Sequence, residues 1–563
     1  MARALLTAIA AVLSCGLFAT AAPAHDAVQG DNAIRRENAL PGTTAWQIQI
    51  GGNVDLYASP VSAAAGDDVP LFVSTPDRYR LVVYRLGWYA GAGARLVACL
   101  PSCAADEPGQ AQPQRAGLVG GAAGWQLTDV LHTTSDWTSG YYLVEALLAH
   151  GGAAATFFIL QEPAGTASPA QTVVQVPVNT WQAYNTWGGA SLYNFLGPRS
   201  TTVSFDRPLG RYAQSPLWWE IQLVRFLERE GYDVSYQSDV DTDLDPGSLL
   251  RHRLVLVAGH DEYWSSAMRD AFDAALAAGT NLGFLGSNDG YWNLRYADNH
   301  HTVVSAKSLY DSTPVLRDKT AMFREIGRPE CMLMGVQHTW FGRLPRPLDY
   351  TVPAQAAGDG WFAGTGFQAG SVVAGVVGRE HDQLNPFPDA CIHPGLTVLF
   401  HYDGGGGDQN ADAVRFTAPS GARVFASGAQ QFSWGLDDWR SDGTDFSAPP
   451  VDQGLGIPAD PRLQQFMRNA LDDLTRPAPP TGVTVSADGN DLHVSVGPSN
   501  DPRVLGFGAF IRGATRWVRV CKGITFCDAP MPPGAGPLRV VVITVDRWHR
   551  ASAATAFVLP RHA

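Results

Sequence analysis

The chain has 563 residues, of which 45% are hydrophobic and 17% charged, so a single domain and a globally disordered chain are both excluded. The formal net charge is −13 and no Lys/Arg block is present, so neither nucleic acid nor an anionic membrane surface is an expected partner. High Gly, Pro and aromatic contents favour β-sandwiches and loop-rich α/β domains over helical bundles.

Residues 1–24 have the pattern of a signal peptide. Arg3 precedes the apolar stretch from Ala4 to Leu17, and Ala22-Pro23-Ala24 supplies the small-x-small cleavage pattern. No second apolar run of about 20 residues follows, so no transmembrane segment is expected. Cys15 matches a lipoprotein box poorly, which disfavours lipid anchoring. The sequence therefore predicts a secreted or periplasmic protein.

Six cysteines remain after Cys15, and an even number in an exported chain indicates disulfides. Two pairs are close enough to clamp local turns, and the third follows by elimination, which leaves no free thiol for nucleophilic catalysis. The expected pairs are Cys99–Cys103, Cys521–Cys527 and Cys331–Cys391.

Three segments differ in their periodicity. Residues 39–165 form short strands between Gly, Pro and Asp turns, which predicts an Ig-like β-sandwich. Residues 170–475 alternate strands with helices, which predicts parallel pairing and a doubly wound α/β sheet. After the Pro-rich linker at 476–480, residues 480–560 resemble a fibronectin type III sandwich. The fold class expected is therefore multidomain, β plus α/β.

Within the second segment, the strands Leu254–Gly259 and Asn281–Gly286 flank a predicted helix with Ser265 as N-cap and Gly279 at its end. An earlier helix is predicted to begin at Ser215-Pro216.

The acidic run of Asp239, Asp241, Asp243 and Asp245 lacks the Gly and Glu of an EF-hand loop, so it is interpreted as a solvated loop. The chain also has no GxSxG elbow, no HExxH helix and no Walker loop.

Polar side chains gather after three predicted strands. His260, Asp261 and Glu262 follow one strand, Asn288 and Asp289 follow the next, and a polar-aromatic run from 179 to 185 follows an earlier one. Ligands of open α/β sheets bind outside the carboxyl ends of strands, so these groups are expected to share one rim. The alternative is that the acids cap helices and the aromatic rings pack.

The segments 259–265 (GHDEYWS), 180–189 (TWQAYNTWGG), 139–142 (SGYY) and 284–292 (FLGSNDGYW) resemble the large, catalytic subunit of N,N-dimethylformamidase. The resemblance spans roughly residues 39–474 and implies an amidotransferase-like α/β catalytic domain behind the first sandwich. It also implies hydrolysis of the amide of a small formamide at a mononuclear iron held by two tyrosines and one glutamate.

Carried over by motif, the resemblance implies Glu262, Tyr184 and Tyr142 as the metal ligands, with Tyr141 as the competing assignment for the last. Three hard oxygen donors suit a ferric ion. His260 is expected to shuttle protons, and Asn288 to orient water or to donate to the developing oxyanion.

Two other functions stay open. One is a non-catalytic secreted binding protein on the same scaffold, and the other is a metal-free hydrolase that uses Asp261 and His260. The family enzyme works with a small subunit, whereas this chain carries an export signal and its own C-terminal sandwich, and nothing in the sequence indicates a small subunit. The expected partner is a small amide substrate, and homo-oligomerisation is left open.

Overall fold

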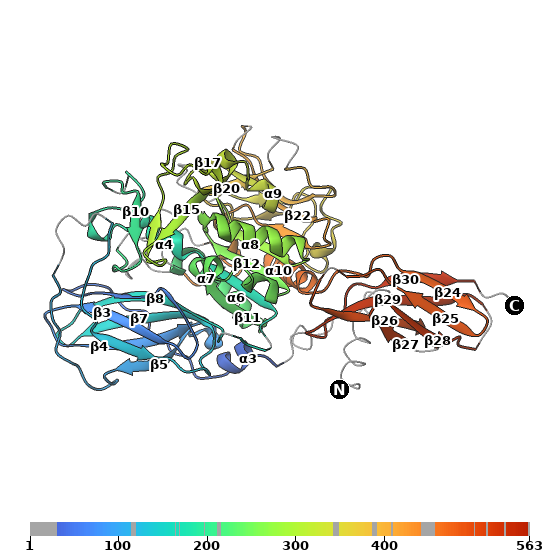
Figure 1. Cartoon of the computed structure of the whole chain (residues 1–563), viewed down its shortest axis with the longest axis horizontal. Helices are drawn as coiled ribbons and strands as arrows, with labels where there is room; N and C mark the ends of the chain where they lie inside the picture. Colours follow the sequence, from blue (N-terminus) through green and yellow to red (C-terminus); the bar gives the residue numbers. More distant parts are fainter. Residues whose placement is uncertain are drawn as a thin grey trace.

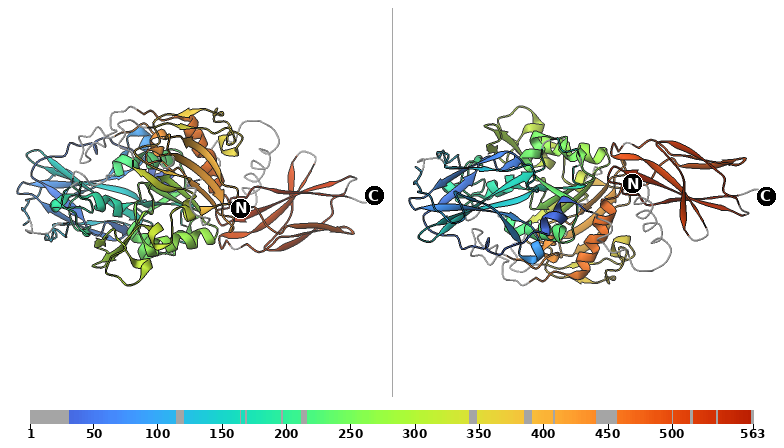
Figure 2. Two further views of the ribbon diagram at one scale, coloured as in Figure 1. Left: turned by 90° about the horizontal axis from the view of Figure 1, so that it is seen from above. Right: turned by 90° about the horizontal axis from the view of Figure 1, so that it is seen from below.

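A computed structural model describes residues 31–113, 120–163, 165–167, 169–195, 197–210, 216–341, 348–384, 391–406, 409–440, 457–499, 501–513, 516–533 and 536–560. The predicted signal peptide (residues 1–24) and Cys15 lie outside the described residues. The protein is multidomain and β-rich, with its first and last sandwiches at opposite ends of the long axis (Figures 1 and 2).

The first part consists of two facing sheets. Alternation places Val69, Leu71 and Val73 of one strand in the core between the sheets, while the residues between them are more exposed. One sheet has the order β1 (Asp55–Ala58), β3 (Asp68–Ser74), β6 (Asp129–His132). The other has the order β2 (Ser62–Ala64), β8 (Ala153–Gln161), β7 (Gly140–Leu148), β4 (Tyr79–Leu86), β5 (Ala94–Leu100).

The central part is built on a nine-stranded sheet. Its order is β11 (Val234–Ser238), β9 (Thr172–Val176), β12 (Leu254–Gly259), β14 (Asn281–Gly286), β23 (Arg423–Ala426), β22 (Ala411–Thr417), β21 (Thr397–Tyr402), β18 (Tyr350–Thr351), β19 (Val372–Val373). The strands from β11 to β23 pair in parallel, and the remaining pairs are antiparallel. The predicted parallel pairing of Leu254–Gly259 with Asn281–Gly286 is confirmed.

Helices cover both faces of this sheet (Figure 1). Strand β12 sends Val255 and Val257 to the face covered by α8 (Ser266–Ala277), and Leu254 and Leu256 to the face covered by α6 (Ile221–Arg229) and α10 (Pro461–Leu474). The predicted cap is confirmed, because the Ser265 hydroxyl accepts from the Met268 amide at 3.0 Å. Gly279 has φ = 83°, a left-handed conformation that suits glycine at a helix end.

Two local predictions differ from the structure. The helix predicted from Ser215-Pro216 is divided into α5 (Pro216–Trp219) and α6, with Glu220 between them, and Ser215 lies outside the described residues. The acidic run is not a solvated loop but the helix α7 (Asp239–Leu244). Ser238 caps this helix, and Asp239 is fully buried, where one of its carboxylate oxygens accepts from the Asn179 amide at 2.9 Å.

Small sheets lie above the carboxyl ends of the parallel strands. One has the order β10 (Thr202–Ser204), β16 (Thr302–Val304), β15 (Trp292–Ala297), β13 (Tyr263–Ser265), and the other pairs β17 (Gln337–Phe341) with β20 (Glu380–Gln383). The short helices α3 (Ala33–Asn38), α4 (Val178–Tyr184) and α9 (Cys331–Met334) complete the described helices. All three predicted disulfides are present: Cys99–Cys103, Cys331–Cys391 and Cys521–Cys527.

The C-terminal part is again a pair of antiparallel sheets. Their orders are β24 (Thr484–Asp488), β25 (Asp491–Ser495), β28 (Phe526–Pro530) and β27 (Trp517–Gly523), β26 (Val504–Arg512), β29 (Leu538–Asp546), β30 (Thr555–Leu559). Buried polar contacts join this part to the central sheet, among them Arg253 to Asp546 at 3.2 Å and Arg503 to Thr280 at 2.7 Å. No helix in the described part of the chain is long and apolar enough to cross a membrane.

Candidate active site

The polar groups that follow β9, β12 and β14 meet at one rim, as the sequence predicts. The backbone amide of Glu262 donates to the Thr180 hydroxyl at 3.0 Å, which ties the end of β12 to α4. The amide of Asp261 donates to the Asp289 carboxylate at 2.9 Å, which ties it to the end of β14. These bonds link the three strand ends at the position where open α/β sheets bind ligands.

Phenol groups surround the Glu262 carboxylate at this rim. The Tyr184 hydroxyl donates to Glu262 Oε2 at 2.9 Å, and the Tyr193 hydroxyl lies 2.7 Å from both carboxylate oxygens. The Tyr263 hydroxyl lies 2.6 Å from that of Tyr193. We call Tyr184, Tyr193 and Glu262 the phenol–carboxylate cluster.

Electrostatics keep both phenols of the cluster neutral when no cation is bound. Burial, and then the negative charge of Glu262, raise the pKa of Tyr184 and Tyr193 well above the ordinary value of 10. Lys307 places its ammonium nitrogen 3.3 Å from the centre of the Tyr193 ring. Burial lowers the pKa of Lys307 to about 7, although Glu262 acts in the opposite direction.

The structure does not bring Tyr142 together with Tyr184 and Glu262. Its hydroxyl donates to the Thr138 carbonyl at 2.8 Å, and its ring stacks between Trp137 and Phe158 inside the first sandwich. The reason is strand alternation, because successive residues of β7 point to opposite faces of the sheet.

The competing assignment, Tyr141, faces the central part of the molecule. Its hydroxyl donates to Glu220 at 2.8 Å, so neither residue of the SGYY motif contacts Glu262. Tyr193 takes that place instead.

His260, Glu380 and Asn288 form a second group beside the cluster. His260 Nε2 lies 2.9 Å from Glu380 and 3.8 Å from Glu262, so His260 and Glu262 face the same site although only one residue separates them. Burial opposes protonation of His260, but Glu380 and then Glu262 outweigh it and raise the pKa to about 9. The Asn288 amide nitrogen donates to Glu380 at 2.8 Å. Among the described residues, the Asn288 amide oxygen is buried without a hydrogen-bond partner.

Asp261 has other hydrogen-bond partners than His260. Its carboxylate accepts from Gln175 at 2.7 Å, whereas His260 forms ion pairs with Glu380 and Glu262. The backbone amide of Asp261 is held by Asp289, and a catalytic role for Asp261 stays a prediction.

The sequence did not reveal Tyr193, Glu380 or Lys307. Tyr193 lies nine residues beyond Tyr184 with no repeating pattern, and Glu380 comes from β20, far along the chain. The positions of these residues along the sequence do not indicate that they meet, because the folding of the chain between them decides whether they come into contact. Only the sharp turn at Asn288, with φ = 58°, falls in a motif that the sequence had already singled out.

The donor chemistry of the cluster fits a hard metal ion. No group of three or more His, Cys, Asp and Glu side chains in the described ranges is arranged to hold a metal. The phenol–carboxylate cluster differs from such a group because two of its three members are tyrosines. Both phenol hydroxyls donate hydrogen bonds to the Glu262 carboxylate. Three such oxygens suit a trivalent cation, which can replace those protons.

Comparisons with known proteins bear on this site. No curated protein matches the chain. The spore cortex lytic enzyme SleM of Clostridium perfringens is 19% identical over 15% of this chain, with a TM-score of 0.12, and the chain spans 29% of its length. The chitinase ChiA74 of Bacillus thuringiensis is 11% identical over 59% of each chain, with a TM-score of 0.13. Likenesses this low carry no argument about fold or function.

A family model gives a clear result. The model described as N,N-dimethylformamidase beta subunit-like, C-terminal, matches residues 80–445, which include the phenol–carboxylate cluster, His260, Asn288 and Glu380. The matched region is more than half of the chain, and it agrees with the resemblance found in the sequence motifs. The chain therefore belongs to the N,N-dimethylformamidase beta subunit-like family.

Proposed function

We propose that the protein is an exported, metal-dependent amidohydrolase that cleaves the C–N bond of a small linear amide. The single observation that carries this proposal is the convergence of Tyr184 and Tyr193 on Glu262 at the carboxyl ends of the parallel strands. These three residues would hold a mononuclear ferric ion, and Tyr193 replaces Tyr142 in the expected set.

A ferric ion held there would supply Lewis acidity to the scissile carbonyl and to water. The protein's own groups would then manage protons. His260, flanked by two glutamates, would give a proton to the leaving amine nitrogen. Glu380 would keep that imidazolium oriented through the 2.9 Å ion pair.

Asn288 is suited to orient water or to donate to a developing oxyanion. Its amide nitrogen carries two protons, of which Glu380 accepts one, and its amide oxygen, which accepts, has no hydrogen-bond partner among the described residues. A water molecule that donates to this oxygen would have its lone pairs directed away from Asn288.

Three features support export and the finer fold assignment. The signal-peptide pattern at residues 1–24 and the three disulfides suit a secreted or periplasmic protein. We further propose that the central sheet is amidotransferase-like and that the flanking sandwiches are Ig-like and fibronectin type III-like, in keeping with their sheet orders.

Elemental analysis and a visible spectrum of the purified protein test the metal site. We expect about one iron per chain and a tyrosinate-to-iron absorption band. Tyr193→Phe and Glu262→Gln should lose most of the iron, whereas Tyr142→Phe is the matched control and should keep both the iron and the band. A colourless, iron-free wild type, or loss of iron in Tyr142→Phe alone, would reject the ligand set.

Screening small N-substituted amides then tests the activity. We expect the iron-loaded protein to release amine from at least one formamide or acetamide, and the iron-depleted protein to release none. Activity that survives complete removal of the metal would support the metal-free alternative instead.

A further inference from the structure

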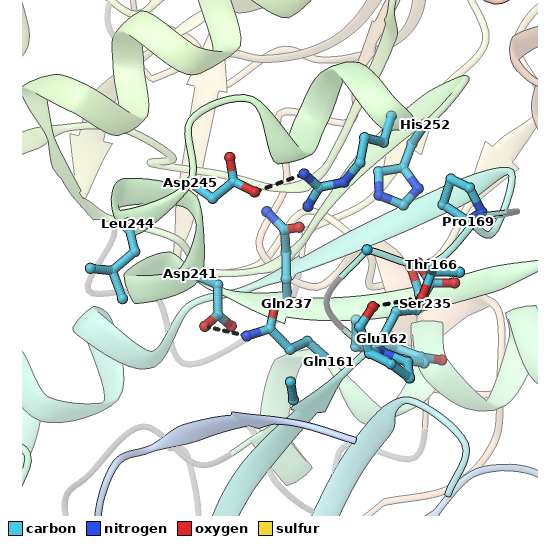
Figure 3. Close-up of a pocket in the computed structure, with 15 residues that line it drawn as sticks. Gln161, Glu162, Thr166, Pro169, Ser235, Gln237, Asp241, Leu244, Asp245 and His252 are labelled. Atoms are coloured by element: carbon cyan, nitrogen blue, oxygen red, sulfur yellow. Dashed lines mark hydrogen bonds and ion pairs between the residues drawn. The ribbon is translucent and has the colours of Figure 1, made fainter. Parts of the chain in front are cut away.

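A cavity of about 300 Å³ lies where the first sandwich meets the edge of the central sheet. Its walls come from the end of β8, from β11, from α7 and from the segment before β12 (Figure 3). Strand β11 is the edge strand of the nine-stranded sheet, pairing there only with β9. The residues described as lining this cavity include no member of the phenol–carboxylate cluster, so the cavity is separate from the candidate active site.

Two nearly buried side chains present hydrogen-bond acceptors to this cavity. His252 is 3% exposed, and its Nδ1 lies 2.8 Å from the Ala170 carbonyl oxygen. A carbonyl oxygen only accepts, so Nδ1 carries the proton and Nε2 presents its lone pair. Burial lowers the pKa of His252 to about 3, which keeps the ring neutral.

Gln237 is 4% exposed, and only the nitrogen of its side-chain amide forms hydrogen bonds within the protein. Its amide nitrogen donates to Thr242 at 2.7 Å and to Ser248 at 3.0 Å, which uses both of its protons. Neither the amide oxygen of Gln237 nor His252 Nε2 has a hydrogen-bond partner among the described residues. The cavity therefore contains two acceptors that are open to a ligand's donor.

The charge of the lining is negative. Three carboxylates face one guanidinium: Glu162, Asp241 and Asp245 against Arg251. Arg251 already donates to Asp245 at 2.7 Å, and Gln161 donates to Asp241 at 3.1 Å (Figure 3). The donors of Arg251 and Gln161 are thus turned toward partners within the protein, and burial raises the pKa of Glu162 and Asp241.

We propose that this cavity binds a small organic ammonium ion that carries N–H donors. Such an ion supplies N–H donors to His252 Nε2 and the Gln237 amide oxygen, and positive charge to the carboxyl groups of the lining. The volume admits a primary or secondary alkylammonium ion, and no metal-binding group of His, Cys, Asp and Glu occurs among the described residues. Hydrolysis of an amide releases an amine of this class, so the proposed reaction would supply the ligand, but binding itself does not depend on that activity.

Calorimetric titration of the full chain with dimethylammonium chloride tests the proposal. Tetramethylammonium chloride at the same ionic strength is the matched probe, because it has the same charge and no N–H group. We expect saturable binding of dimethylammonium and at least about tenfold weaker binding of tetramethylammonium. Equal binding of the two ions, or no saturable binding, would overturn the proposal.

Variants locate the site. Glu162→Gln keeps an oxygen for the Ala170 amide, which now donates at 2.8 Å, but removes the charge, and it should weaken dimethylammonium binding about tenfold. Gln237→Met removes the acceptor at similar size and should also weaken it. Asp488→Asn, on the exposed face of β24, is the control and should bind as the wild type does.

Glu262→Gln separates this site from the active site. Unchanged ammonium binding in Glu262→Gln is expected, and its loss would show that the amine binds at the phenol–carboxylate cluster, which overturns the proposal. Circular dichroism of each variant identifies a folding defect. If Glu162→Gln is misfolded, Gln237→Met decides the outcome.

Discussion

Asn288 and Glu145 are both buried polar residues, but their hydrogen-bond partners indicate different roles. Asn288 donates one amide proton to Glu380, and its amide oxygen has no partner among the described residues, at a position where a ligand is expected. Both carboxylate oxygens of Glu145 are buried without a hydrogen-bond partner among the described residues. The first arrangement is suited to chemistry, whereas the second is a cost to stability.

Asn288→Asp should lower kcat by about two orders of magnitude while iron is retained. The substitution tolerates the left-handed backbone at φ = 58°, but it places a second carboxylate beside Glu380 and removes the amide donor. Steady-state kinetics and iron content of the same preparation check this. Wild-type kcat in this variant would refute the role given to the Asn288 amide.

Glu145 makes folding stability depend on pH. Burial raises the pKa of its carboxyl to about 9 in the folded protein. Between its ordinary pKa of about 4.5 and pH 9 the unfolded chain loses this proton and the folded chain keeps it, so stability falls as pH rises. The effect is about 1.4 kcal/mol per pH unit at most.

Glu145→Gln should remove this dependence. Melting curves at pH 5 and pH 8 are expected to show a smaller loss of melting temperature for the variant than for the wild type. Parallel curves for the two proteins would mean that Glu145 is ionised in the fold.

At the scale of elements, the insertion between β14 and β23 brings Glu380 to the rim. Strand β20, which carries Glu380, pairs with β17, and the disulfide between Cys331 and Cys391 closes a span of 60 residues around them. The insertion also holds Asn288, whose backbone amide donates to Asp382 at 2.9 Å, whereas the backbone amide of Glu262 bonds to Thr180 of α4. The phenol–carboxylate cluster and the group around Glu380 therefore depend on different parts of the fold.

Replacing both Cys331 and Cys391 by Ser should loosen the insertion selectively, because the cross-link limits the freedom of the closed loop. Amide hydrogen exchange is expected to speed up in β17 and β20, and kcat to fall, while exchange in β12 and β14 stays slow. Iron content should be nearly unchanged, since the proposed ligands lie outside the loop. Uniform loosening of the central sheet would contradict this division.

At the scale of the whole molecule, buried charge joins the first sandwich to the central part. Arg85 of β4 and Glu228 of α6 are fully buried and meet at 2.8 Å, and Tyr236 donates to the same carboxylate at 3.0 Å. Removing one partner of such a pair leaves the other charge buried and uncompensated.

Glu228→Gln should therefore destabilise the protein by about 3–5 kcal/mol. Asp31→Asn breaks the exposed pair with Arg36 and is the matched control, expected to change stability by less than about 1 kcal/mol. Denaturant unfolding followed by tryptophan fluorescence compares the two variants. Similar small effects in both would show that the Arg85–Glu228 pair does not hold the two parts together.

The sequence alone determined the features that depend on near neighbours along the chain. The parallel strands at 254–259 and 281–286, the Ser265 cap and the two closely spaced cysteine pairs follow from short patterns, because apolar runs, caps and close spacings act over a few residues. The family motifs likewise identified Tyr184, Glu262, His260 and Asn288.

Which second tyrosine faces Glu262 depends on tertiary packing. Tyr142 lies in the SGYY motif, but strand alternation turns it into the sandwich core, and the chain reversal after α4 brings Tyr193 to the carboxylate. Glu380 and the cavity beside β11 also arise from segments far apart in sequence. Such meetings are set by the packing of whole elements, and the free energy that selects them is not encoded in any one segment.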